Sequence, residues 1–245
     1  MDMSLINSTN NFRVKQWSKL KMRRQRDEQK CFIAEGYHIV AEAFKQNRLI
    51  EVITTEKNAP FPVPTFHVTY EVMEKLTSMA TPTKVLGICR QSQEGEIGQN
   101  ILLVEQVHHP GNLGTIIRNG AAFGIDTMVV ENSADVYNAK VIQASQGMLF
   151  HLNIIKRPLA TFVAEIKVQG YQIIGSDVRE GTPLHSARVH AKRALLLGNE
   201  GEGVTENLLS QCDMKVHIPM NARCESLNVG VAAGIILYGL QHAEA

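Results

Sequence analysis

The sequence predicts an α/β protein of two domains, on three observations. Over residues 100–245, short aliphatic runs alternate with helical patterns, which is typical of a parallel sheet covered by helices on both faces. Strand and helix patterns also alternate over about ninety residues before it, which is enough for a small α/β domain. Residues 91–99 between them are polar, contain two glycines and lack an apolar period, as linkers do. We therefore expect domains at residues 1–92 and 100–245.

The first domain is expected to begin with a basic helix. Apolar periodicity, together with chain-breaking prolines and glycines, sets the order of the elements that follow it. They are a strand at 31–36, a helix at 37–44, a strand at 50–53, a proline-containing loop at 60–64, a helix at 71–76 and a strand at 85–89.

The second domain shows a more regular alternation. Six aliphatic runs predict strands at 101–107, 127–131, 152–155, 171–175, 194–197 and 215–218. Helical patterns are expected at 113–123, 139–149, 159–168, 205–211 and 227–242. Ligands bind at the carboxyl ends of the strands in an open parallel sheet, so a site is expected in the loops that leave these strands.

The formal net charge of +1 conceals a basic segment. Between Arg13 and Lys30 the chain carries eight lysines and arginines against two carboxylates, a local net charge of +6. Such a segment on a near-neutral protein suits a polyanion. A solvated helix face is an equal alternative.

Composition narrows the class of protein. The chain has no run of about 18 apolar residues that would span a bilayer, and its amino terminus lacks the basic-then-apolar order of a signal peptide. Its four cysteines are scattered and form no Cys-x-x-Cys pair. We therefore expect a cytoplasmic protein with reduced thiols rather than a disulfide framework or a zinc site.

The most informative loop follows the aliphatic run at 194–197. It is residues 198–203 (GNEGEG). Because glycine has no Cβ, it lets a flat cofactor approach the main chain closely. Glu200 is the side chain best placed to hold an amine or a neighbouring arginine. A glycine-rich turn with an exposed carboxylate and no ligand is the alternative.

A second loop, residues 108–118, follows the first strand of this domain. Pro110 and Gly111 make a turn, and Asn112 is a good helix N-cap. Arg118 lies six residues further on, and its planar guanidinium suits phosphate or a developing oxyanion. The alternative is that Asn112 only caps the helix and that Arg118 lies in solvent.

A third loop begins at residues 218–220 (IPM) and ends at residues 226–229 (SLNV). A helix rich in small residues starts there, and Ser226 is its expected N-cap. Gly230 and Gly234 let that helix approach a neighbour closely.

Together these loops resemble the motifs of the SpoU (TrmH) family of RNA ribose 2′-O-methyltransferases, within the knotted SPOUT superfamily. The family motifs read approximately N-x-G-x-x-x-R, then L-G-x-E-x-x-G, then I-P-M followed by S-L-N-V. The chain carries all three in order, as Asn112/Gly114/Arg118, Leu197/Gly198/Glu200/Gly203, and residues 218–220 with 226–229. Residues 32–36 (FIAEG) and the helix after them resemble the small ribosomal-protein-like RNA-binding domain that many members carry.

The resemblance implies a deep trefoil knot in the second domain and S-adenosylmethionine as the methyl donor. It assigns the cofactor to Leu197, Gly198, Asn199, Ile218, Met220 and Leu227. It assigns the chemistry to Arg118, with Asn112, Glu200, Ser226 and Asn228 positioning Arg118, the ribose and the cofactor. Because an arginine holds its proton strongly, we expect Arg118 to anchor the forming alkoxide and the phosphate electrostatically, with a role as the base second.

The substrate that the resemblance implies is structured RNA, whose ribose supplies the 2′-hydroxyl. Ribosomal RNA is favoured, with tRNA as the alternative. Lys19, Arg23 and Arg24 of the basic helix are the expected RNA contacts. The resemblance also implies a homodimer whose active sites are completed across the interface. From the residues themselves we expect no metal and no membrane partner.

The chain departs from the family pattern at His109, where Asp is frequent, and at Gly230, where Ser is frequent. Neither is a motif residue, so these departures concern loop detail and substrate fit. One alternative is a non-catalytic RNA-binding protein on the same fold. A Rossmann-type enzyme is disfavoured because no G-x-G-x-x-G follows the first strand. Metal catalysis is disfavoured because the nine histidines show no H-E-x-x-H spacing.

Overall fold

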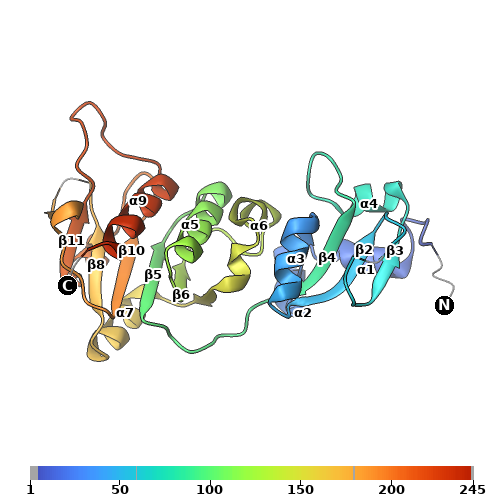
Figure 1. Cartoon of the computed structure of the whole chain (residues 1–245), viewed down its shortest axis with the longest axis horizontal. Helices are drawn as coiled ribbons and strands as arrows, with labels where there is room; N and C mark the ends of the chain where they lie inside the picture. The colour runs from blue at the N-terminus through green and yellow to red at the C-terminus, as the bar shows by residue number, and fades with distance from the viewer. Residues whose placement is uncertain (1–4, 59, 179, 244–245) are drawn as a thin grey trace. The chain divides into compact units, whose positions relative to one another are not determined.

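The computed structural model describes residues 5–58, 60–178 and 180–243, and the chain divides into two compact units. The amino-terminal unit is Met1–Ser92 with Asp135–Phe150, and the carboxyl-terminal unit is Gln93–Ala134 with His151–Ala245. Residues 1–4, which begin the stretch used to argue against a signal peptide, lie outside the described residues. Each unit has its own sheet (Figure 1). None of the helices in the described ranges is long and apolar enough to cross a membrane.

The carboxyl-terminal unit is built on a seven-stranded sheet in the order β7-β6-β5-β10-β8-β11-β9. Its strands are β5 (Asn100–Glu105), β6 (Thr127–Glu131), β7 (Asn153–Lys156), β8 (Gln172–Ser176), β9 (Thr182–Pro183), β10 (Arg193–Leu197) and β11 (Met214–His217). All the pairings between them are parallel, which confirms the predicted fold class of this part of the chain. The two-residue strand β9 was not expected, because two residues are too few to show an alternation.

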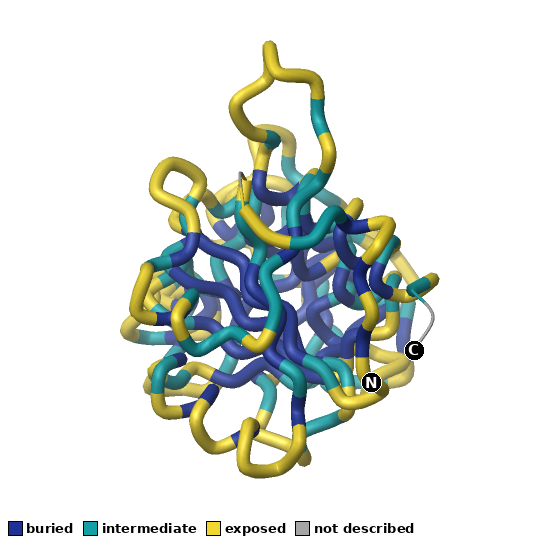
Figure 2. The backbone as a smooth tube through the Cα atoms, turned by 90° about the vertical axis from the view of Figure 1, so that its left-hand side faces the viewer, coloured by how far each residue is buried: buried dark blue, intermediate teal, exposed yellow. Residues whose placement is uncertain are grey.

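Helices cover both faces of this sheet, and Figure 1 shows α5 and α9 side by side on one of them. On the other face, Phe162 of α7 packs in one buried cluster with Leu103 and Leu196. Leu102 alternates with Leu103 along β5, so it points to the α5 face, where it meets Gly120. The central strands β5 and β10 are buried except for their first residues, and Figure 2 shows buried backbone in dark blue surrounded by exposed loops in yellow. The helices of this unit are α5 (Pro110–Ala122), α7 (Leu159–Val168), η2 (Leu184–Ser186), α8 (Glu206–Leu209) and α9 (Val229–Gln241).

Small residues let α9 lie against α5, as the sequence predicted. A Cβ added at Gly230 would lie 3.0 Å from Cγ2 of Thr115, and one at Gly234 would lie 3.0 Å from Nδ2 of Asn119. The Asn119 amide also donates a hydrogen bond to the carbonyl oxygen of Gly230 at 2.8 Å. This packing fixes where α9 begins relative to the loop before α5.

The amino-terminal unit has a four-stranded sheet in the order β1-β4-β2-β3, antiparallel except for the parallel pair β2–β3. One side of it buries a cluster that includes Trp17, Met73 and Leu86. The strands are β1 (Cys31–Glu35), β2 (Leu49–Thr54), β3 (Thr65–His67) and β4 (Val85–Arg90). The helices are α1 (Phe12–Lys19), α2 (Arg23–Gln29), α3 (Tyr37–Lys45), α4 (Tyr70–Leu76), α6 (Ala139–Ser145) and η1 (Met148–His151).

The single basic helix that we expected is two helices, α1 and α2, separated by a turn at residues 20–22. Leu20 at the end of α1 is buried, and Arg26 of α2 turns inward, with only 6% of its surface exposed. Nη1 of Arg26 donates to the carbonyl oxygens of Leu20 at 2.9 Å and Lys21 at 2.7 Å. These bonds satisfy carbonyl groups that the end of α1 leaves free, so Arg26 stabilises the break.

Residues 135–150, which we expected within the second domain, belong to the amino-terminal unit. Nη2 of Arg26 lies 2.6 Å from Oδ2 of Asp135, and each side chain is only 7% exposed. The ring of Phe32 packs against Tyr137 and Phe150, with centroids 4.8 and 5.8 Å apart. Local periodicity predicted the helix but carries no information about which sheet it packs on.

Candidate active site

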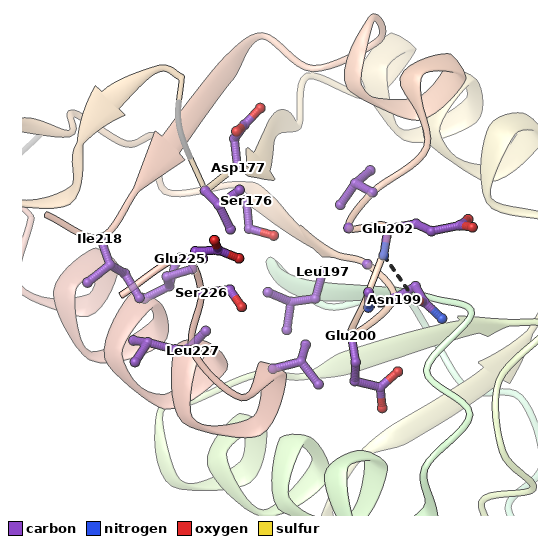
Figure 3. Close-up of a pocket in the computed structure, with 18 of the residues that line it drawn as sticks. Ser176, Asp177, Leu197, Asn199, Glu200, Glu202, Ile218, Glu225, Ser226 and Leu227 are labelled. Carbon is purple, nitrogen blue, oxygen red and sulfur yellow. Dashed lines mark hydrogen bonds between the residues drawn. The ribbon is translucent and has the colours of Figure 1, made fainter. Parts of the chain in front are cut away.

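A cavity of about 280 Å³ lies at the carboxyl edge of the sheet in the carboxyl-terminal unit. Its walls come from the loops that leave β8, β10 and β11 and from the first turns of α9. Figure 3 shows Leu197 between the 198–203 loop on one side and Ile218 and Leu227 on the other. The cavity is lined by all six residues to which the cofactor was assigned, namely Leu197, Gly198, Asn199, Ile218, Met220 and Leu227.

The Asn199 side chain organises the 198–203 loop. Its Oδ1 accepts hydrogen bonds from the backbone N–H groups of Gly201 at 2.8 Å and Glu202 at 3.2 Å. Its Nδ2 donates to the carbonyl oxygen of Gln106, just beyond β5, at 3.0 Å. The backbones of Asn199 and Gly203 also exchange two hydrogen bonds, of 2.9 and 3.0 Å. The loop is therefore closed on itself and tied to the neighbouring strand.

The structure adds a second reason for glycine at position 198. A Cβ there would lie 2.1 Å from the carbonyl carbon of Gly203 and 2.2 Å from the nitrogen of Val204. This close approach is to the loop's own backbone, and it comes in addition to the approach of a cofactor that the sequence predicts. Gly203 has a φ of +75°, which an L side chain rarely adopts.

A buried carboxylate that the sequence analysis missed holds the far end of this loop. Glu105, the last residue of β5, is 5% exposed. It accepts hydrogen bonds from the backbone N–H of Thr205 at 2.9 Å and from its hydroxyl at 2.8 Å. The sequence signal that could have identified Glu105 is a single carboxylate at the end of an aliphatic run. A carboxylate buried there needs hydrogen-bond donors, which indicates a structural role.

A chain of three polar side chains joins the three motifs. Nδ2 of Asn228 donates to Oδ1 of Asn112 at 2.9 Å, and Nδ2 of Asn112 donates to Oε1 of Glu200 at 2.9 Å. Oδ1 of Asn228 accepts from the backbone N–H of Gly230 at 2.9 Å. A backbone donor at one end and a carboxylate acceptor at the other allow only one orientation of both amides. The chain therefore fixes the direction of every hydrogen bond in it.

Two predicted helix caps were wrong. In both places an asparagine of the Asn228–Asn112–Glu200 hydrogen-bond network takes a different role from the one expected. Pro110 is the first residue of α5 and His109 its N-cap, because proline suits a position whose N–H would be unpaired. Asn112 therefore lies within the first turn, where its amide bonds to Glu200 instead. The N-cap of α9 is Asn228 rather than Ser226. Ser226 is exposed and lines the cavity.

The surroundings of Glu200 favour its ionised form. Partial burial raises its pKa, but the hydrogen bond from Asn112, backbone amides and the charge of His108 outweigh burial and lower the pKa overall. Asp177, Glu202 and Glu225 line the same cavity, and its described lining contains no lysine, arginine or histidine. The cavity therefore favours a ligand that carries positive charge.

The loop after β8 is a further part of the site that the sequence analysis did not identify. Ser176 and Asp177 line the cavity opposite the 198–203 loop (Figure 3). They reach it because β8 pairs with β10 in the sheet. No sequence motif marks this loop, and local periodicity does not predict the order of the strands in a sheet. The position of this loop beside the cavity could therefore not be predicted.

Arg118 is not among the residues that line the cavity. It is exposed on α5, and within the described ranges its side chain has no hydrogen bond or ion pair. The structure thus brings Asn112, Glu200 and Asn228 together by hydrogen bonds and places Ser226 on the cavity wall. It leaves Arg118 on the surface of the helix that carries Asn112.

Comparison with known proteins supports the family that the three loops indicate. Residues 99–238 match the SpoU rRNA Methylase family, and residues 11–87 match the MRM3-like substrate binding domain. The chain belongs to the SpoU rRNA methylase family. It is 32% identical to the 23S rRNA (guanosine(2553)-2′-O)-methyltransferase RlmP of Bacillus subtilis (strain 168), over 98% of this chain and 100% of that protein.

Solved structures of similar proteins share the fold of the chain. An RNA 2′-O ribose methyltransferase superposes with a TM-score of 0.83 at 26% identity, covering 97% of this chain and 98% of the other. An rRNA methyltransferase from Sinorhizobium meliloti, solved with AdoMet bound, gives a TM-score of 0.86 at 24% identity, covering 97% of each chain. The predicted family and the predicted enzyme class, an S-adenosylmethionine-dependent RNA ribose 2′-O-methyltransferase, are confirmed.

The cavity fits this cofactor. S-adenosylmethionine carries a sulfonium and an ammonium group, which suit the carboxylates of Asp177, Glu200, Glu202 and Glu225. Leu197, Ile218 and Leu227 supply apolar walls of the kind that an adenine ring needs. The closed 198–203 loop offers backbone groups at fixed positions between them.

Proposed function

We propose that this chain transfers a methyl group from S-adenosylmethionine to the ribose 2′-hydroxyl of a nucleotide in ribosomal RNA, with 23S rRNA as the favoured molecule. The observation that carries the proposal is the hydrogen-bonded chain Asn228–Asn112–Glu200 beside an acidic cavity lined by two of the three motifs. The name of the 32% identical relative supports the choice of RNA.

The residues of the cavity would hold the cofactor, which supplies an activated methyl group when bound. In this proposal the 198–203 loop and Ile218, Met220 and Leu227 bind it, and the carboxylate of Glu200 is held at one position by Asn112. Ser226 and Asn228 would position the ribose. A ribose hydroxyl is a weak nucleophile, so the site must stabilise the negative charge that develops on its oxygen.

Arg118 is the group proposed to stabilise that charge. Its guanidinium is exposed and unpaired within the described ranges, so it is available to RNA phosphate or to a partner's cavity. Arg118→Ala is expected to abolish methyl transfer and to leave the affinity for S-adenosylmethionine within a few-fold of wild type. Loss of cofactor binding by a folded Arg118→Ala protein would contradict this role.

We propose a homodimer that pairs through α9. Val231, Ile235 and Tyr238 are 50%, 39% and 57% exposed, and their spacing puts them on one face of the helix. An exposed apolar stripe of this kind marks an interface. Ile235→Asp is expected to convert a dimer to a monomer, as measured by light scattering, and to reduce methyl transfer with it. Val168→Asp, at an isolated apolar residue that is 91% exposed, is the matched control.

Three further features belong to the proposal. Residues 1–92 bind the substrate RNA, supported by the match to a substrate binding domain. The catalytic domain is formed by residues 100–245 apart from residues 135–150, which belong to the amino-terminal unit, and it contains a deep trefoil knot, supported by family membership. A crystal structure in which the backbone passes through no loop of its own chain would contradict the knot. The protein acts in the cytoplasm, with the ribosomes, which cell fractionation tests.

Mapping of 2′-O-methyl groups in the RNA of cells with and without the gene tests the function. One ribosomal RNA position is expected to lose its methyl group in the deletion strain. Wild-type protein should restore it and Arg118→Ala should not. A methyl group lost from tRNA would favour the tRNA alternative, and an unchanged map would favour a non-catalytic RNA-binding protein.

A further inference from the structure

Most cations of the basic segment are engaged by groups of this chain. Lys21 donates to the carbonyl oxygens of Lys75 and Thr77, both at 2.7 Å. Arg26 is buried against Asp135 and cannot reach a ligand. The others with partners are Arg13, which lies over the ring of Phe66, and Arg23 and Arg24, which pair with Asp27 and Glu28. The net charge of the segment therefore overstates what it offers to RNA.

Two of the remaining cations lie together on α1. Lys15 and Lys19 are exposed, and their side chains have no hydrogen bond or ion pair within the part of the chain that the structure describes. They are one helical turn apart, about 6 Å along the axis. Val14 and Trp17 occupy the buried side of the same helix. The two ammonium groups thus share one solvent-facing side.

Phe12 stands on that same side. It is the first residue of α1, three positions before Lys15 and seven before Lys19, which puts all three within one face. Phe12 is 72% exposed, and phenylalanine is usually buried. Asn11 caps the helix through the backbone N–H of Arg13, so the ring is held at a defined helix end. We call Phe12, Lys15 and Lys19 the α1 face.

We propose that the α1 face binds an unpaired stretch of the substrate RNA, with one base stacked on Phe12 and adjacent phosphates on Lys15 and Lys19. The proposal rests on the RNA function proposed above and names the form of RNA that is recognised. An exposed aromatic ring beside cations is how proteins hold single strands. In a duplex the flat faces of the bases are covered by their neighbours, so the ring of Phe12 would have nothing to stack on.

Fluorescence anisotropy of the full-length protein with a labelled single-stranded RNA, repeated over a range of salt concentrations, separates the two parts of the proposal. Phe12→Ala is expected to weaken binding by at least about fivefold at every salt concentration, with an unchanged salt slope. Phe12→Trp should restore the affinity. Lys15→Ala and Lys19→Ala should each lower the slope of log K against log salt by about 0.7.

Tyr37→Ala provides the matched control, because Tyr37 is an aromatic residue of the same unit that is 59% exposed on another helix. It is expected to bind as wild type does. Equal losses for Phe12→Ala and Tyr37→Ala, or wild-type affinity for Phe12→Ala, would overturn the proposal. So would a Phe12→Ala loss of the same size on a fully paired RNA.

Labelled methyl transfer to ribosomal RNA, measured on the same proteins, keeps the two proposals apart. If the wild type transfers methyl groups while Phe12→Ala binds RNA normally, only the α1 face is refuted. If the wild type neither binds nor methylates RNA, the proposed function fails and the α1 face fails with it.

Discussion

Replacing Gly198 by alanine places a Cβ where the backbone of the 198–203 loop leaves no space for it. The added Cβ would lie 2.1 Å from the carbonyl carbon of Gly203, whereas ordinary contacts begin at 3.4 Å. The obstacle is backbone rather than the end of a flexible side chain, so one strand of the loop must move by about 1.3 Å. The substitution therefore opens the loop that forms one wall of the cavity.

The magnitude follows from the bonds that this movement breaks. Asn199 and Gly203 exchange two backbone hydrogen bonds, of 2.9 and 3.0 Å, and a shift of this size takes both beyond bonding distance. At about 0.5–1.5 kcal/mol each, the closed loop loses about 1–3 kcal/mol. If the cofactor binds only the closed loop, its affinity falls by roughly 5- to 150-fold.

Calorimetric titration of S-adenosylmethionine into the purified protein measures this loss. Gly201→Ala is the matched control, because it changes the same loop and its Cβ would meet only Oδ1 of Asn199, at an ordinary 3.5 Å. Gly201→Ala is expected to bind within about twofold of wild type. Equal affinities for Gly198→Ala and Gly201→Ala would refute the view that the closed loop holds the cofactor.

Three further outcomes are expected. Asp135→Ala leaves its buried arginine unpaired and should cost about 3–5 kcal/mol of unfolding free energy in urea titrations; a loss below about 1 kcal/mol would show that the pair is open in solution. Burial raises the pKa of Cys212 to about 11, so a thiol reagent at pH 8 should label the exposed Cys224 first, and equal rates would contradict this. Asn112→Leu should raise the lowered pKa of Glu200, as measured by carbon-13 NMR titration. The hydrogen bond from Asn112 stabilises the folded protein fully above the ordinary pKa of about 4.5, and this stabilisation is lost as the pH falls through the pKa of Glu200 in the folded protein. An unchanged pKa would show that Asn112 does not hold Glu200.

Much of the fold follows from local pattern. Strand β6 and helix α7 have the predicted bounds, because an apolar period and a flanking proline or glycine mark their ends. The convergence of the three motifs was also predictable in outline, since parallel strands end at the same edge of a sheet. Strand β10 pairs directly with β5, which puts Glu200 within hydrogen-bond reach of Asn112.

What could not be predicted depends on contacts between distant parts of the chain. Ser226 and Asn228 are equally good caps by residue type. Asn228 caps α9 through its amide oxygen because the nitrogen of the same amide donates to Oδ1 of Asn112, and this partner is 116 residues away in the sequence. The placement of Asp177 on the cavity and of Asp135 beside Arg26 likewise follows from strand order and tertiary packing.

The most direct test incubates purified protein with methyl-labelled S-adenosylmethionine and ribosomal RNA from cells that lack the gene, and then digests the RNA to nucleosides. All the label is expected in one 2′-O-methylated nucleoside, at a level that Gly198→Ala reduces and Gly201→Ala preserves. Label on a base, or no label with a protein that binds the cofactor, would contradict the assignment of this site to ribose methylation.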